Sequence, residues 1–156
     1  MTTTLHDPYN RPVSNLRISL TPRCNLSCIY CHAEGEKTPE NEMDAEEIIE
    51  IMRVGARFGI RTVKFTGGEP LLRPDLIHIV KNVPEGVESS LTTNGVFLAA
   101  LAPELKRAGL RRVNISLDSL NHETYKKITG SDRLDDVLEG IQAALDAGLT
   151  PVKLNM

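Results

Sequence analysis

The pattern of the sequence predicts an α/β fold with parallel strands. Five short segments with the two-residue alternation of strands are separated by segments with helical periodicity. Strands that are separated by helices are joined by right-handed crossovers and pair in parallel. One face of each strand is apolar and the other is polar, so helices can cover only one face of the sheet. Together these observations predict a partial (incomplete) TIM-type β/α barrel with parallel strands and a polar concave face.

Each strand is predicted from its alternation of apolar and polar residues. The predicted strands are residues 16–21, 62–66, 87–92, 112–117 and 151–155. A sheet with one solvated face is the alternative interpretation, but such sheets are common only where the strands are antiparallel. We therefore expect the polar face to line a lumen that holds a ligand.

The helices are predicted from apolar spacing and from their end signals. The first begins at Asp44, where Asp44 and Glu47 form a capping box, and it ends at Gly59. The others are a short helix after Pro74, helices over 98–108 and 134–148, and an extra short helix over 121–129. Residues 32–42 are polar and predict a loop.

Size and composition limit the classes of function. The chain has 156 residues, 40% of them hydrophobic and 25% charged, which predicts one globular domain. The net charge of −3 gives no long-range attraction to nucleic acid or to an anionic membrane. No apolar stretch reaches the roughly 18 residues of a membrane span, and the first residues lack a signal-peptide pattern, so we expect a cytoplasmic protein.

The last predicted strand, 151–155, is an apolar edge strand with nothing after it. Because an exposed edge of this kind promotes aggregation, we expect residues 1–156 to be the N-terminal part of a longer chain. The alternative is that this strand meets a partner subunit in a homodimer.

Three cysteines, Cys24, Cys28 and Cys31, are clustered directly after the first predicted strand. An odd, clustered set does not form a disulfide framework, and reduced thiols at this spacing predict a metal site. Three thiolates leave one coordination position open, which is typical of a catalytic centre or an iron–sulfur cluster. A Cys₃His zinc site with His32 is the alternative, although His32 is poorly placed because it is adjacent to Cys31.

The C-x₃-C-x₂-C spacing with Tyr30 before the last cysteine resembles the radical S-adenosylmethionine enzymes. A second resemblance is Thr66-Gly-Gly-Glu-Pro70, at the end of the second predicted strand. The resemblance implies that the three cysteines hold a [4Fe–4S] cluster whose open iron binds S-adenosylmethionine. It also implies that Gly68 and Glu69 contact the methionine moiety, because glycine permits close approach and a carboxylate accepts from an ammonium.

Within that superfamily the whole chain resembles the GTP 3′,8-cyclases of molybdenum cofactor biosynthesis. The matching segments are 15–21, 24–31, 66–73, 91–95, 108–119 and 152–155. The resemblance implies GTP contacts at Arg17, Lys64, Thr92 and Lys153, all of which fall on the predicted polar face. It also implies S-adenosylmethionine contacts at Tyr30, Gly68, Glu69 and Ser116. Arg73 has two predicted roles, a further GTP contact or a cap of the following helix.

The resemblance implies a lyase that forms a 5′-deoxyadenosyl radical, which takes hydrogen from C3′ of GTP and gives (8S)-3′,8-cyclo-7,8-dihydroguanosine triphosphate. Its partners would be an electron donor of flavodoxin or ferredoxin type and the downstream cyclic pyranopterin monophosphate synthase. A second [4Fe–4S] cluster is expected only in a C-terminal region that this sequence does not include, so the fragment alone is expected to turn over poorly. The alternatives are a peptide-modifying or haem-pathway radical enzyme and a non-catalytic metal-binding module.

Overall fold

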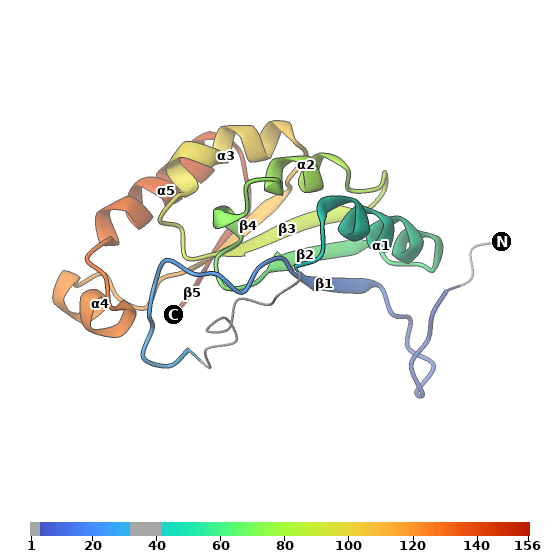
Figure 1. Ribbon diagram of the computed structural model, residues 1–156, viewed down its shortest axis with the longest axis horizontal. Helices are drawn as coiled ribbons and strands as arrows, with labels where there is room; N and C mark the ends of the chain where they lie inside the picture. The colour runs from blue at the N-terminus through green and yellow to red at the C-terminus, as the bar shows by residue number, and fades with distance from the viewer. Residues whose placement is uncertain (1–3, 32–41) are drawn as a thin grey trace.

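The computed structural model of the chain, which describes residues 4–31 and 42–156, is an α/β structure with one open sheet. The strands lie in the order β1-β2-β3-β4-β5, and every neighbouring pair is parallel (Figure 1). They are β1 (Asn15–Ser19), β2 (Thr62–Thr66), β3 (Glu88–Thr93), β4 (Arg112–Ser116) and β5 (Val152–Asn155). The helices are α1 (Ala45–Arg57), α2 (Leu76–Lys81), α3 (Leu98–Arg107), α4 (His122–Thr129) and α5 (Leu134–Asp146), with a 3₁₀ turn, η1 (Pro70–Leu72).

The strand order explains why one face of the sheet is left without helices. Each new strand is added at the same edge, so crossovers of one hand bring the helices to the same face. In Figure 1, α1, α2, α3 and α5 lie together on one side of the strands. A doubly wound sheet reverses its strand order and covers both faces, whereas this order is that of a β/α barrel. The predicted partial barrel is confirmed.

The helix-covered face holds the hydrophobic core. Alternate strand residues point into it and are at most 1% exposed; they are Val63, Phe65, Leu91, Val113 and Ile115. The helices contribute side chains at helical spacing, among them Ile48, Ile49, Met52, Leu76, Ile79, Leu98, Leu105, Leu134 and Val137. Burying an aliphatic side chain stabilises the fold by about 1.5–3 kcal/mol, so this face provides most of the driving force for folding.

The local end signals of two helices are those expected from the sequence. Asp44 accepts from the Glu47 amide at 2.8 Å, and the Glu47 carboxylate accepts from the Asp44 amide at 2.9 Å, so the predicted capping box forms. Asn121 caps α4 by accepting from the Thr124 amide at 3.0 Å. The predicted strand and helix bounds agree with the structure to within one to two residues, whereas η1 was not predicted. Most of the loop predicted over 32–42 lies outside the described residues.

Candidate functional site

The three cysteines lie in the loop after β1, at the carboxyl end of the parallel strands. All three thiols are free, with Cys24 and Cys31 exposed and Cys28 half-buried. Burial is the main cause that raises the pKa of the Cys24 and Cys28 thiols. Three soft thiolate donors in one loop suit an iron–sulfur cluster. Within residues 4–31 and 42–156, no three metal-ligating side chains are grouped for a single ion, and His32 lies outside those residues.

Helix α4 holds the middle of this loop through its backbone. The Ser27 amide donates to the carbonyl of Thr129 at 3.0 Å, and the Ile29 amide donates to that of Ile128 at 2.9 Å. Both acceptors are in the last turn of α4, where carbonyls have no partner within the helix. The loop therefore satisfies the end of α4, and α4 in turn fixes the peptide units around Cys28.

A side-chain hydrogen bond joins the same loop to the segment after β4. The Tyr30 hydroxyl donates to the Asp118 carboxylate at 2.8 Å. Burial first, and then this hydrogen bond, raises the pKa of Tyr30. The aromatic residue of the cysteine motif thus connects the cysteine loop to the end of β4, where the predicted cofactor residue Ser116 also lies.

The two glycines after β2 allow a very close approach of backbone segments. A Cβ on Gly68 would lie 2.4 Å from the Arg23 carbonyl oxygen and 2.5 Å from that of Pro22, and one on Gly67 would lie 2.5 Å from that of Thr21. The Gly68 amide donates to the Thr21 carbonyl at 2.7 Å. The sequence predicted glycine here for the approach of a ligand; the structure shows that the chain's own cysteine loop already requires it.

Glu69 is fully buried and is bonded to the end of β3. Its carboxylate accepts from the Leu71 amide at 2.9 Å, the Thr93 hydroxyl at 2.7 Å and the Asn94 amide at 2.7 Å. Burial raises the pKa of this carboxyl group above its usual value, although the hydrogen bonds from Asn94, Leu71 and Thr93 oppose the shift. No basic side chain of residues 4–31 or 42–156 forms an ion pair with it.

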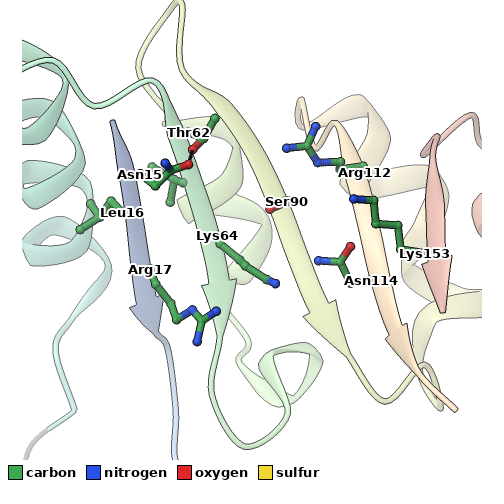
Figure 2. A pocket seen from close by; sticks show the side chains of 10 residues that line it. Asn15, Leu16, Arg17, Thr62, Lys64, Ser90, Arg112, Asn114 and Lys153 are labelled. Carbon is green, nitrogen blue, oxygen red and sulfur yellow. Dashed lines mark hydrogen bonds between the residues drawn. The ribbon is translucent and has the colours of Figure 1, made fainter. Parts of the chain in front are cut away.

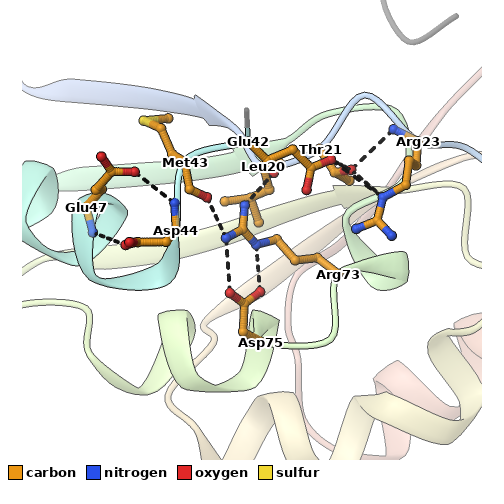
Figure 3. A network of polar contacts seen from close by, with 9 residues as sticks. All are labelled: Leu20, Thr21, Arg23, Glu42, Met43, Asp44, Glu47, Arg73 and Asp75. Atoms are coloured by element: carbon orange, nitrogen blue, oxygen red, sulfur yellow. Dashed lines mark hydrogen bonds and ion pairs between the residues drawn. The ribbon is translucent and has the colours of Figure 1, made fainter. Parts of the chain in front are cut away.

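Arg73 is buried and has neither of the two roles that the sequence suggested. Figure 3 shows its guanidinium group donating to the carbonyls of Leu20 at 2.7 Å and Met43 at 2.8 Å, and to both carboxylate oxygens of Asp75. It thus joins the end of β1, the start of α1 and the start of α2. The N–H groups of the guanidinium already donate to acceptors within the protein, so this side chain is poorly suited to bind a substrate phosphate.

The face of the sheet without helices contains a hollow of about 380 Å³ whose charged lining is mostly basic (Figure 2). This volume is within the ordinary range of small-molecule sites. Its lining includes three of the four predicted GTP residues, Arg17, Lys64 and Lys153, but not Thr92. The other lining residues are Asn15, Leu16, Thr62, Val63, Ser90, Arg112 and Asn114.

Three of the four cations that line this hollow have no ion-pair partner among residues 4–31 and 42–156. Among the described residues, Glu88 pairs with Arg112 at 3.4 Å, whereas Arg17, Lys64 and Lys153 have no ion-pair partner. Neither Glu88 nor Glu69 therefore forms an ion pair with Arg17, Lys64 or Lys153. Three uncompensated cations converging on one hollow favour a polyanionic ligand.

Thr92 lies on the same polar face, one residue along β3 from the apolar Leu91. Its hydroxyl oxygen is buried and has no hydrogen-bond partner among the described residues. Buried hydroxyls are normally hydrogen-bonded, since leaving one without a partner costs about 1–3 kcal/mol. A buried hydroxyl without a partner is consistent with a bond that forms only when a ligand is present.

The structure also shows site residues for which the sequence gave no role. Asn25, Asn94 and Asp118 contact the cysteine loop or belong to it, and Arg112 and Asn114 line the hollow. Their position in the sequence could have identified Asn94 and Asp118 as candidate site residues. Both directly follow predicted parallel strands, and the residues after such strands converge at one edge of the sheet.

Within the described residues, no helix is both long enough and apolar enough to cross a membrane. The model of the Radical SAM superfamily matches residues 18–156 of this chain.

Curated relatives resemble the chain along 97% of its length. The chain is 53% identical to a probable GTP 3′,8-cyclase of Archaeoglobus fulgidus over 152 residues, and 55% identical to that of Pyrococcus abyssi over 153 residues. These alignments cover 51% and 50% of the relatives. The chain therefore spans about half the length of the curated relatives it matches.

Solved structures with low sequence identity share the fold. Streptococcus suis SuiB bound to S-adenosylmethionine has a TM-score of 0.79 at 21% identity, covering 90% of this chain and 33% of SuiB. The structure of anSMEcpe with bound AdoMet has a TM-score of 0.68 at 23% identity, covering 91% of this chain and 42% of that protein. At this identity the likeness concerns the arrangement of strands and helices.

Proposed function

The chain belongs to the radical SAM superfamily, and we propose that residues 1–156 are the cluster-binding and GTP-binding core of a GTP 3′,8-cyclase whose second half lies outside this sequence. Membership in the superfamily implies a [4Fe–4S] cluster and S-adenosylmethionine as cofactors. The finer assignment is supported by the curated relatives, each described as a probable GTP 3′,8-cyclase.

The observation that carries the GTP assignment is the set of three cations in the hollow that have no ion-pair partner among the described residues. Arg17 and Lys64 are register partners on β1 and β2, while Lys153 pairs with Asn114 across β4 and β5. A triphosphate carries several negative charges, and each cation can form charge-assisted hydrogen bonds to its oxygens. Thr92 lies on the same face of the sheet, outside the lining of the hollow, and its buried hydroxyl has no hydrogen-bond partner among the described residues. We propose that these four residues bind GTP.

The residues at the carboxyl end of the strands suit the cofactors. In our proposal Cys24, Cys28 and Cys31 ligate the cluster, and Tyr30, Gly68 and Ser116 line the site of S-adenosylmethionine. The Glu69 carboxylate has room for about one more donor beside its three present ones, which a methionine ammonium group could fill. When bound, these cofactors would supply the radical chemistry that removes hydrogen from C3′ of GTP; bonding of C3′ to C8 of guanine would then need one further electron and one proton to give the closed-shell product.

The chain's own contribution is placement of the two sites relative to each other. The hollow opens on the polar face of the strands, and the cysteine loop follows the carboxyl end of β1. In a β/α barrel this arrangement brings a lumen-bound substrate toward the catalytic edge. A flavodoxin or ferredoxin would supply the electron, and a cyclic pyranopterin monophosphate synthase would take up (8S)-3′,8-cyclo-7,8-dihydroguanosine triphosphate.

The experiment that tests this proposal measures GTP binding by calorimetry. The double variant Lys64→Ala/Lys153→Ala should bind GTP at least about a hundredfold more weakly, since each of the two lost charge-assisted bonds is worth about 1.5–3 kcal/mol. The matched control is Lys81→Ala/Lys127→Ala, which removes the same charge from the exposed surfaces of α2 and α4. Equal affinity in both double variants, or no GTP binding by the unaltered chain, would favour a radical enzyme with another substrate.

A second measurement tests the cofactor chemistry separately. The chain is reconstituted with iron and sulfide without oxygen, reduced, and assayed for 5′-deoxyadenosine with and without GTP. Formation stimulated by GTP supports the cyclase, while formation indifferent to GTP supports the superfamily chemistry alone. Zinc at one per chain with no acid-labile sulfide would establish a non-catalytic metal module instead.

A further inference from the structure

The sulfur of Cys24 faces a side-chain amide that the proposed function does not use. The Asn94 Nδ2 atom lies 4.0 Å from Cys24 Sγ, at hydrogen-bonding range for sulfur. The same nitrogen donates to Asn25 Oδ1 at 2.8 Å. An amide nitrogen carries two hydrogens, so it can serve both acceptors at once.

The position of this amide is fixed on three sides by other bonds. The Asn94 backbone amide donates to the buried Glu69 carboxylate at 2.7 Å, and Asn94 Oδ1 accepts from the Val96 amide at 3.1 Å. The bond to Asn25 fixes the third side. With its backbone, oxygen and nitrogen all bonded, the side chain has no freedom to turn its donor away from Cys24.

We infer that Asn94 is a positioning residue that donates an N–H···S hydrogen bond to the Cys24 sulfur and thereby tunes the reduction of the cluster; this inference rests on the proposal that Cys24 is a cluster ligand. Hydrogen bonds to the sulfurs are one of the factors that set the potential of an iron–sulfur cluster. Reduction adds negative charge that spreads onto the sulfurs, and a hydrogen bond to a more negative acceptor is stronger. The Asn94 amide therefore favours the reduced cluster.

Glu69 has a second role in this arrangement. Its carboxylate holds the backbone of Asn94, so the acid of the Gly-Gly-Glu segment acts on the cysteine loop through Asn94. The path from β2 to the cluster loop thus runs through Glu69, Asn94 and Cys24, and every link is a hydrogen bond between segments distant in the sequence.

The test is the reduction potential of the reconstituted chain, followed by electron paramagnetic resonance during a redox titration. Asn94→Ser keeps an oxygen that can accept from the Val96 amide but cannot reach Cys24. We expect the ratio of reduced to oxidised cluster at a fixed potential to fall about tenfold, which is about 59 mV for a one-electron couple. The matched control is Asn82→Ser at the C-terminal cap of α2. The Asn82 side-chain amide donates to the His78 carbonyl, and its replacement should leave the ratio unchanged.

A second variant keeps the inference testable if Asn94→Ser does not fold. Asn94→Asp retains the volume and the oxygen that caps Val96, but places a carboxylate oxygen opposite the sulfur, so the reduced fraction should fall further than in Asn94→Ser. Unchanged potentials in Asn94 variants with full iron and sulfide content would overturn the inference while leaving the proposed function intact. A wild-type chain that assembles no cluster would overturn both.

Discussion

Gly68→Ala is the substitution whose effect the structure defines most sharply. The backbone of Gly68 is not in the left-handed region, so alanine meets no conformational penalty there, only a collision. The added Cβ would lie 2.4 Å from the Arg23 carbonyl oxygen, and since such contacts essentially never fall below 3.0 Å, the two segments must separate by at least about 0.6 Å. That movement lengthens two bonds of 2.7 Å, from the Gly68 amide to Thr21 and from the Glu69 amide to Arg23. At about 1 kcal/mol each, with added strain, we expect a loss of about 2–4 kcal/mol.

The assay is urea unfolding of the metal-free chain, together with the iron content after reconstitution. The control is Gly86→Ala, because a Cβ there meets nothing within 4 Å while φ is +77°. This control should cost about 1 kcal/mol, from the left-handed conformation alone, and leave iron content unchanged. We expect Gly68→Ala to lose both stability and iron. If Gly68→Ala is no less stable than Gly86→Ala and binds full iron, the close approach of the two segments does not constrain the cluster loop.

Three further predictions concern the polar contacts. Thr92→Val should leave the free energy of unfolding unchanged or raise it by up to about 1 kcal/mol, because the buried hydroxyl has no hydrogen-bond partner among the described residues. The same substitution should weaken GTP binding in calorimetry. A marked loss of stability would contradict this reasoning. Arg73→Lys should lower the free energy of unfolding in urea by about 3 kcal/mol, since a lysine cannot donate at once to Asp75 and to the carbonyls of Leu20 and Met43. The control is Arg53→Lys at an exposed position. Equal costs for the two substitutions would refute the prediction. Arg73 also holds the pKa of Asp75 below 3.8, so below that pH the unfolded chain binds more protons than the folded one. The stability difference between wild type and Asp75→Asn should therefore be present at pH 6 and shrink as the pH falls through the pKa of Asp75.

The fold was predictable because its signals are local. The alternation along the strands placed Arg17, Lys64 and Lys153 on one face, and the structure brings these three side chains to one hollow. The spacing of Asp44 and Glu47 predicted the start of α1, because a capping box depends only on residues three positions apart. The alternation of side chains along a strand and the capping of a helix end depend only on neighbouring residues. Both can therefore be predicted without the tertiary structure.

The internal contacts of the site were not predictable because they join segments far apart in the sequence. Nothing in the residues around Glu69 shows that its carboxylate is bonded to Thr93 and Asn94. The same holds for Arg73, whose partners at Leu20 and Met43 are set by how the loops after β1 and β2 cross. The types and spacing of the residues identify Glu69 and Arg73 as candidate site residues. Only the folded structure shows with which groups they form hydrogen bonds.

The crossing of these loops gives a physical reason for two motifs to occur in one chain. The segment after β2 donates three hydrogen bonds of 2.7 Å to the residues that lead into the cysteine loop. The Arg73 guanidinium donates to the Leu20 carbonyl, the Gly68 amide to that of Thr21 and the Glu69 amide to that of Arg23. A peptide in which three of four successive carbonyls accept from another segment has little freedom in the residues just before its first thiol. The glycines are needed for this approach, and the arginine and glutamate secure it from either side. The Gly-Gly-Glu-Pro segment is therefore the support of the cysteine loop as well as a candidate cofactor contact, and substitutions in it should alter cluster retention even where they touch no ligand.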